Sequence, residues 1–158
     1  MSSRIHRRPD GQLWNIIICE DKKQEAFKMR QIMESKGYNV LESMENGRQL
    51  INYMEENPNK VDMVLLDIVM PVLDGFATFV EMREKGLGTR VVFATVENSR
   101  AVMAAAAKLG AVGYIATSMT RDSSPLFFSF VARFFLEAVF LVSPLVSLIG
   151  VAPSGISF

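Results

Sequence analysis

Short apolar runs alternate along the chain with longer segments that place apolar residues at helical spacing. The apolar runs lie at 14–19, 38–41, 63–66, 91–94 and 112–116. The segments with helical spacing lie at 22–36, 46–56, 76–85 and 98–109. Buried strands of a parallel sheet are continuously apolar, whereas amphipathic helices repeat apolar residues every three or four positions. The pattern therefore predicts an α/β fold, with a parallel sheet covered by helices on both faces and joined by right-handed crossovers.

Residues that favour helix ends flank the predicted helices. Asn46 is suited to cap the second helix, and Asn98 or Ser99 is suited to cap the fourth. Gly37 and Gly110 follow the first and fourth helices. Glycine readily adopts the left-handed backbone that commonly ends a helix, so these positions support the same boundaries.

Acidic side chains follow two of the predicted strands. Glu20 and Asp21 follow the first strand, and Asp67 follows the third. In the flavodoxin-like strand order, 2-1-3-4-5, these strands are neighbours at the topological switch point, where such sheets bind ligands. Three carboxylates held close together repel one another, and a divalent cation relieves the repulsion. A hard oxygen site with few carboxylates suits Mg²⁺ or Mn²⁺.

The same residues also have simpler interpretations. Glu20 and Asp21 could merely cap the first helix, because acidic side chains are favourable at a helix N-terminus. Thr95 follows the fourth strand, on the other side of Asp67. Its hydroxyl could donate to an oxyanion in the site or bond its own backbone.

Composition limits the classes of function. The 158 residues suggest one domain of ordinary core size. The 17 basic and 17 acidic residues give a formal net charge of zero, so no overall field favours nucleic acid. The single cysteine, Cys19, ends an apolar run and is expected in the core. One cysteine allows no internal disulfide, which fits a reducing, cytoplasmic compartment.

Residues 14–122 resemble the receiver domain of two-component response regulators, including the stand-alone receivers of chemotaxis. The most specific part of the resemblance is the stretch Asp67-x-x-Met70-Pro71-x-x-Asp74-Gly75. The acidic pair Glu20-Asp21, Thr95 after the fourth strand and Tyr114 in the fifth complete it. The resemblance implies a (βα)5 three-layer sandwich with the flavodoxin-like strand order.

The resemblance also implies roles for these residues. Asp67 would accept a phosphoryl group from a sensor histidine kinase or a phosphotransfer protein. Asp21 and Asp67 would hold Mg²⁺, with Glu20 acting through water and Val69 through its backbone carbonyl. Thr95 would then move toward the phosphoryl oxygens and Tyr114 would turn inward behind it. The chain would be an autocatalytic phosphoryl acceptor rather than a turnover enzyme, and it would signal to a downstream protein target.

The sequence departs from the receiver pattern after the fifth strand. Receivers usually carry Lys-Pro there, and spacing from Thr95 and Tyr114 places Thr117 and Ser118 at those positions. A threonine cannot form an ion pair with a phosphoryl group. Losing a hydrogen bond to a charged group costs roughly 1.5–3 kcal/mol, so we expect phosphorylation to persist and the switch to respond weakly.

The two ends of the chain differ from the receiver segment. Residues 1–13 include Arg4, Arg7 and Arg8 and are expected to form a flexible basic leader. Residues 123–158 form an apolar tail in which the ionisable side chains are Arg133 and Glu137. Three interpretations stay open: a membrane segment at 125–151, a fifth helix that packs on a partner, or a truncation or reading-frame product.

Several functions are compatible with this pattern. The leading hypothesis is a stand-alone receiver, and the alternative is a degenerate receiver that serves as a binding or scaffold module. An FMN-binding flavodoxin is disfavoured because Glu20 and Asp21 are acidic where the phosphate would bind. An aspartate-based phosphatase is disfavoured because Val69 stands where a second carboxylate is needed. Output would pass through protein contacts without nucleic acid, and self-association to a dimer stays open.

Overall fold

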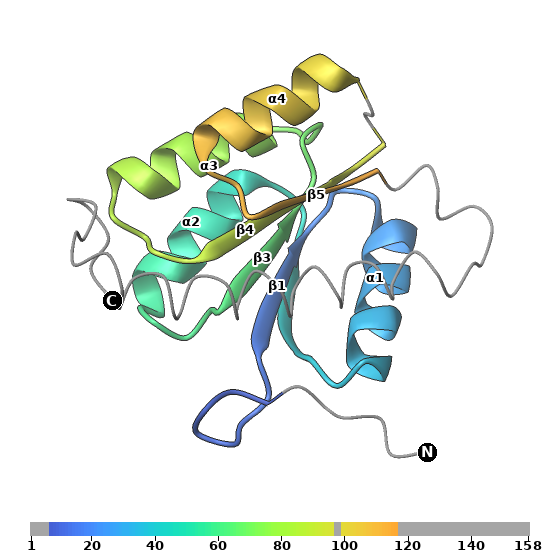
Figure 1. The fold of residues 1–158 in the computed structure, drawn as a ribbon, viewed down its shortest axis with the longest axis vertical. Helices are drawn as coiled ribbons and strands as arrows, with labels where there is room; N and C mark the ends of the chain where they lie inside the picture. Colours follow the sequence, from blue (N-terminus) through green and yellow to red (C-terminus); the bar gives the residue numbers. More distant parts are fainter. Residues whose placement is uncertain (1–6, 97–98, 117–158) are drawn as a thin grey trace, which may run out of the picture.

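The computed structural model describes residues 7–96 and 99–116, which form a five-stranded parallel sheet and four helices (Figure 1). The strands are β1 (Asn15–Cys19), β2 (Asn39–Met44), β3 (Met63–Leu66), β4 (Arg90–Thr95) and β5 (Gly113–Ala116). The helices are α1 (Lys23–Ser35), α2 (Gly47–Glu56), α3 (Gly75–Glu84) and α4 (Arg100–Leu109). The strand order is β2-β1-β3-β4-β5, which confirms the predicted flavodoxin-like architecture.

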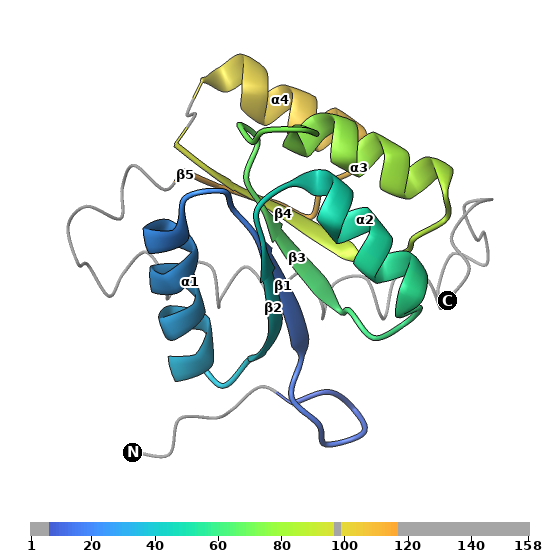
Figure 2. The ribbon, with the colours of Figure 1, turned by 180° about the vertical axis from the view of Figure 1, so that it is seen from behind.

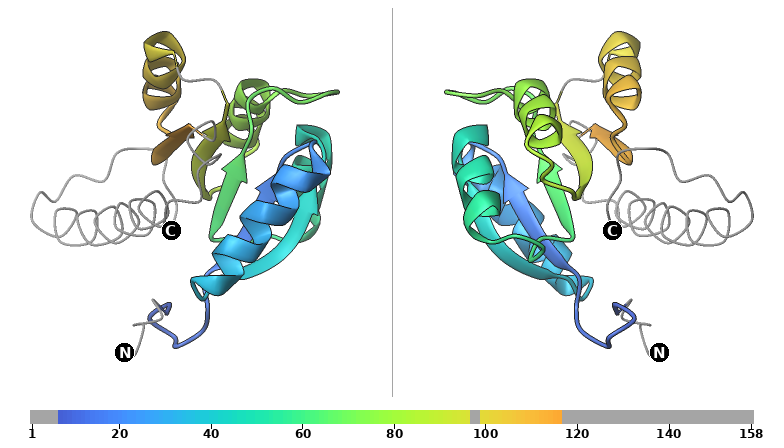
Figure 3. Two further views of the ribbon diagram at one scale, coloured as in Figure 1. Left: turned by 90° about the vertical axis from the view of Figure 1, so that its right-hand side faces the viewer. Right: turned by 90° about the vertical axis from the view of Figure 1, so that its left-hand side faces the viewer.

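The helices are divided between the two faces of the sheet. α2 and α3 lie together on one face, and α1 lies on the other (Figure 2). The sheet has the usual twist of parallel sheets, so the axes of its edge strands β2 and β5 are rotated relative to one another (Figure 3). β1 and β3 are neighbouring strands near the middle of the sheet, so their carboxyl ends lie side by side.

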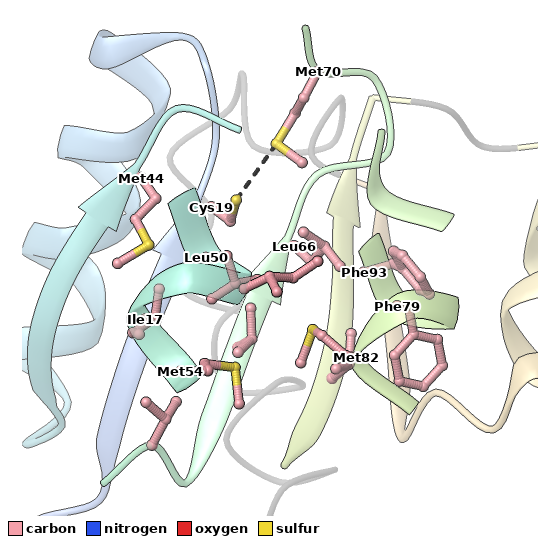
Figure 4. Packing of buried hydrophobic residues seen from close by; sticks show 14 of the residues in the cluster. Ile17, Cys19, Met44, Leu50, Met54, Leu66, Met70, Phe79, Met82 and Phe93 are labelled. Atoms are coloured by element: carbon pink, nitrogen blue, oxygen red, sulfur yellow. Dashed lines mark hydrogen bonds between the residues drawn. The ribbon is translucent and has the colours of Figure 1, made fainter. Parts of the chain in front are cut away.

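Successive residues of each strand point to opposite faces and so build two cores. Ile17 and Cys19 belong to the core under α2 and α3, whereas Ile16 and Ile18 belong to the core under α1. Figure 4 shows the first core, in which side chains of α2 and α3 pack on the strands, including Leu50, Met54, Phe79, Met82, Leu66 and Phe93. Each fully buried side chain of this kind contributes roughly 1.5–3 kcal/mol.

The residues at the helix ends act largely as predicted. The Asn46 side chain accepts a hydrogen bond from the backbone N–H three residues on, at 3.0 Å. Ser99 caps α4 in the same way at 3.3 Å, and Asn98 lies outside the described residues. Gly37 and Gly110 have φ values of 86° and 87°, the left-handed backbone that favours glycine.

Strand β2 is longer than the sequence predicted. The apolar run ends at Leu41, but β2 continues to Met44, whose pairing partner in β1 is Cys19. Glu42 and Ser43 are polar and interrupt the apolar run, yet they lie in the strand. The parallel pairing with β1, through backbone hydrogen bonds, determines the strand end.

The described part of the predicted leader packs at the amino end of the sheet. A turn brings Arg7 beside Leu13 in an antiparallel bridge, and Gly11 N–H donates to Arg8 at 2.8 Å. The Arg8 guanidinium lies 3.4 Å from the carboxylate of Asp62, the residue just before β3. This segment is therefore tied to the end of the sheet opposite to the acidic residues.

The predicted apolar tail, 123–158, lies outside the described residues, as do residues 1–6 of the leader. The proposed membrane contact through 125–151 belongs to that part of the chain. Of the four helices that are described, none has the length and apolar character needed to cross a membrane.

The loop between β3 and α3 contains one strained backbone position. Val72 has a φ of 68° and a side chain that is 80% exposed. A β-branched residue rarely adopts this left-handed conformation, because its branched side chain crowds the backbone. The strain costs on the order of 1–3 kcal/mol, and contacts elsewhere in the loop must hold it in place.

Replacing Val72 by glycine should relieve this strain. We expect Val72→Gly to raise the free energy of unfolding by about 1 kcal/mol, since the relief exceeds the extra entropy of a glycine in the unfolded chain. Urea denaturation measures the change. Val69→Gly is the matched control: Val69 is also exposed but does not have a positive φ, so this variant should lose stability. Loss of stability in both variants would contradict the assignment of strain to Val72.

Candidate functional site

The predicted acidic residues meet at the carboxyl ends of two neighbouring strands. Glu20 and Asp21 follow β1, and Asp67 follows β3. Cys19 pairs with Leu66 at the last position of the two strands, so the residues that follow lie side by side. Carboxylate oxygens from all three residues lie within 4.8 Å of one another. The acidic cluster Glu20-Asp21-Asp67 is therefore present as predicted.

Burial makes this cluster electrostatically unfavourable on its own. Asp67 is 3% exposed and Glu20 is 5% exposed. Burial raises the pKa of Glu20, and the neighbouring Asp67 charge raises it further. Burial also raises the pKa of Asp67, whereas hydrogen bonds from Thr95 and from the Ile68 N–H lower it. The folded chain holds these carboxylates together against their mutual repulsion.

Three hydrogen bonds hold the backbone and the carboxylate of Asp67. The Asp67 N–H donates to Cys19 at 2.9 Å, which continues the pairing of the strands by one residue. The Ile68 N–H donates to Asp67 Oδ1 at 2.8 Å, and the Thr95 hydroxyl at the end of β4 also bonds the carboxylate. These contacts hold the Asp67 carboxylate in place just after the carboxyl end of β3.

Gly75 allows the loop after Asp67 to close tightly. The Gly75 N–H donates to Ile68 at 2.8 Å. A Cβ atom at this position would lie 2.2 Å from the Asp67 carbonyl oxygen, so another residue could not fit without displacing the backbone of Asp67. Asp74 caps α3 by accepting from Ala77 N–H at 2.9 Å. The Asp74-Gly75 pair therefore has a defined structural task next to the cluster.

The other residues of the predicted loop have distinct environments. Met70 is buried, and its Sδ lies 3.7 Å from Cys19 Sγ under the loop (Figure 4). Pro71 is exposed, and Val69 is 58% exposed. The role expected for the Val69 carbonyl as a metal ligand stays a prediction.

Cys19 is not available as a nucleophile. Its side chain is fully buried, as predicted from the sequence. Burial, together with the charges of Asp67 and Glu20, raises the pKa of the thiol to about 12. The thiol therefore stays protonated at neutral pH and acts as a small core residue.

Thr95 lies on β4, next to the strand that precedes Asp67, and Tyr114 lies one strand farther out, on β5. Thr95 is the last residue of β4 and is almost completely buried. Tyr114 of β5 pairs with Phe93 of β4, and its half-buried ring packs against the core under α2 and α3. Thr117 and Ser118, at the usual Lys-Pro position, lie outside the described residues.

The cluster is suited to a divalent cation. The Oδ1 atom of Asp21 is buried and has no hydrogen-bond partner among the described residues. A buried carboxylate oxygen that accepts no hydrogen bond is costly, and a metal ion would satisfy it. The donor set is composed of carboxylates, which Mg²⁺ and Mn²⁺ prefer. The residues present therefore fit such an ion.

One residue of the site was not predicted from the sequence. The Lys22 ammonium lies 3.6 Å from Asp21 Oδ1 and 3.8 Å from Glu20 Oε1. Its backbone N–H also donates to Glu20 Oε1 at 3.0 Å. The available signal was its place directly after the acidic pair, but a lysine at a helix start usually points to solvent.

The model of the response regulator receiver domain matches residues 16–123. The chain belongs to this family. The match includes the acidic cluster and all five strands apart from Asn15, the first residue of β1. The family assignment and the observed strand order agree with the resemblance seen in the sequence.

Individual relatives give the same assignment. The receiver is 29% identical to the chemotaxis protein CheY of Halobacterium salinarum, over 68% of this chain and 88% of that protein. It is 26% identical to CheY of Bacillus subtilis, over 68% of this chain and 88% of that protein. A CheX–CheY–BeF₃–Mg²⁺ complex from Borrelia burgdorferi contains a chain with the same fold. Its TM-score is 0.73 at 22% identity, over 87% of this chain and 97% of that one.

The buried Glu20 should make the receiver less stable as pH rises when no divalent cation is present. The folded state raises its pKa from 4.5 to about 7, so the unfolded chain releases this proton first. The contribution of Glu20 to the free energy of unfolding should therefore be constant below about pH 4.5, fall between pH 4.5 and about 7, and be constant again above that range. At pH 8 in EDTA, Glu20→Gln should therefore be more stable than wild type by roughly 1–3 kcal/mol.

Thermal unfolding at pH 4.5 and pH 8 measures this difference. The exposed Glu84 provides the control, since Glu84→Gln should have little effect at either pH. A Glu20→Gln variant that loses stability at pH 8, or changes equally at both pH values, would refute the prediction.

Proposed function

We propose that this receiver accepts a phosphoryl group on Asp67 and signals through protein contacts. The observation that carries the proposal is the cluster itself. Asp67 is buried and fixed by three hydrogen bonds beside two further carboxylates within 4.8 Å. A cluster this crowded has little structural value alone but suits metal-assisted phosphoryl transfer.

The chemistry on Asp67 is a displacement at phosphorus. One carboxylate oxygen of Asp67 attacks the phosphoryl group of a kinase phosphohistidine or a small phosphodonor. A new P–O bond to Asp67 forms while the bond to the donor breaks. That bond is P–N in a phosphohistidine and P–O in a small phosphodonor such as acetyl phosphate. The leaving nitrogen or oxygen takes the electron pair, and the product is an acyl phosphate on Asp67.

Glu20, Asp21 and Asp67, together with the Val69 carbonyl, would hold Mg²⁺ or Mn²⁺. When bound, the ion would neutralise charge on the transferring phosphoryl oxygens. The buried Asp21 oxygen without a hydrogen-bond partner supports this assignment. The remaining groups of the site would orient the nucleophile and exclude water from it.

Thr95 and Tyr114 would report the phosphorylation. The Thr95 hydroxyl already bonds the Asp67 carboxylate, so it lies within reach of oxygens carried on that group. Movement of Thr95 would open space along β4 and β5, into which Tyr114 turns. The two-state element would be the surface made by α4, β5 and the fifth helix expected after β5, and phosphate would bias it.

The partners follow from this chemistry. The receiver would act in the cytoplasm. Its phosphoryl source would be a sensor histidine kinase or a phosphotransfer protein, and its output would be a downstream protein target. A degenerate receiver that only binds partners is the second candidate, and Thr117 in place of the usual lysine favours it.

Intact-mass spectrometry with Mg²⁺ and acetyl phosphate tests the proposed phosphorylation. Wild type should gain one phosphoryl group, and EDTA should prevent the gain. Asp67→Asn should gain none because an amide is not a nucleophile of this kind. Asp74→Asn is the matched control, since asparagine also caps a helix, and it should react like wild type.

The absence of an adduct on folded wild type would overturn phosphorylation and favour the degenerate binding module. An adduct that persists in Asp67→Asn would overturn the choice of Asp67.

Restoring a lysine at position 117 should strengthen the response to phosphorylation. The missing charged hydrogen bond is worth roughly 1.5–3 kcal/mol, so Thr117→Lys should enlarge the phosphorylation-dependent change. Hydrogen–deuterium exchange of β4 and β5 with and without acetyl phosphate measures that change. Ser118→Lys places the same charge one residue away and should behave like wild type. Equal responses in wild type and Thr117→Lys would count against a weakened switch.

A further inference from the structure

Lys22 lies against the acidic cluster from the start of α1. It follows Glu20-Asp21 directly and occupies the position before the first residue of the helix. Its ammonium lies 3.6 Å from Asp21 Oδ1 and 3.8 Å from Glu20 Oε1. The Lys22 charge also stabilises the ionised form of Asp67 and so opposes the rise in the pKa of that carboxyl. All three carboxylates therefore interact with one ammonium group.

The neighbouring lysine shows that this placement is specific. Lys23 pairs with Glu45 at 3.3 Å and is 84% exposed, so it belongs to the outer surface of α1. Over residues 7–96 and 99–116, the ion pairs that reach Glu20 and Asp21 come from Lys22 alone. Two adjacent residues of equal charge thus have different environments.

The ammonium competes for an oxygen that a metal ion would need. Asp21 Oδ1 is the buried atom without a hydrogen-bond partner among the described residues, and Lys22 Nζ is near it but too far for a hydrogen bond. A cation entering the cluster would meet this positive charge within a few ångströms. Like charges at such distances repel appreciably even near a protein surface.

We propose that Lys22 is the built-in counter-ion of the acidic cluster and lowers its affinity for a divalent cation. The proposal rests on the proposed function, in which Glu20, Asp21 and Asp67 hold Mg²⁺. Without metal, the ammonium offsets part of the repulsion among the carboxylates. With metal, the 54% exposed Lys22 side chain must turn away, and part of its ion-pair energy is lost. The residue after the acidic pair thereby sets the Mg²⁺ concentration at which the site fills.

Calorimetric titration of the full chain with MgCl₂ tests the proposal. Lys22→Gln removes the charge and keeps most of the side-chain length, so it should bind Mg²⁺ about three- to tenfold more tightly. Lys22→Arg keeps the charge and should stay within about twofold of wild type. Lys23→Gln is the matched control and should also stay within about twofold. Lys23 is 84% exposed and paired with Glu45, so water and salt screen its charge from the cluster.

A second readout uses the protein without metal. In EDTA, Lys22→Gln should unfold at a lower temperature than Lys23→Gln, because the carboxylates lose their counter-ion. Unchanged or weaker Mg²⁺ binding by Lys22→Gln, or equal tightening by Lys23→Gln, would overturn the inference. If wild type binds Mg²⁺ but the variants behave in one of these ways, the role of Lys22 is wrong while the proposed function is unaffected. If neither wild type nor Lys22→Gln bound Mg²⁺, the metal site of the proposed function would itself be wrong.

Discussion

Repulsion among three carboxylates at the carboxyl ends of β1 and β3 is the constraint on which this receiver depends. Folding places Glu20, Asp21 and Asp67 within 4.8 Å of one another, with two of them nearly fully buried. Such an arrangement opposes stability unless positive charge is supplied. Lys22 supplies part of that charge from within the chain, and a divalent cation would supply the rest. The phosphoryl chemistry proposed for Asp67 depends on the same balance.

The surrounding fold supplies the rigidity that this cluster requires. Strand pairing fixes the backbone on both sides of the carboxylates, and the apolar cores hold the strands in place. The close approach of Gly75 to the Asp67 carbonyl closes the loop, and Val72 accepts a left-handed backbone to complete it. The strained loop and the crowded acids lie together, as expected where structure serves a functional site.

Sequence patterns predicted the strands because apolar runs are a local signal, whereas the acidic cluster was predicted by combining those strands with the flavodoxin-like strand order. Apolar runs mark buried strands, and strand order brings Asp67 beside Glu20. The end of β2 was missed because Glu42 and Ser43 are placed by pairing with β1 rather than by their own preference. The position of Lys22 was missed because a side-chain rotamer depends on neighbours that sequence spacing does not reveal. The roles of Thr117, Ser118 and the apolar tail stay predictions.

The pKa of the Glu20 carboxyl, measured from the ¹³C chemical shift of its carboxyl carbon as a function of pH, tests the central claim most directly. The claim is that the three carboxylates share one crowded, buried site that takes a cation. Without a divalent cation, the pKa of Glu20 should lie well above the ordinary glutamate range, and saturating Mg²⁺ should move it down. A Glu20 carboxyl that titrates in the ordinary range and does not respond to Mg²⁺ would contradict the account.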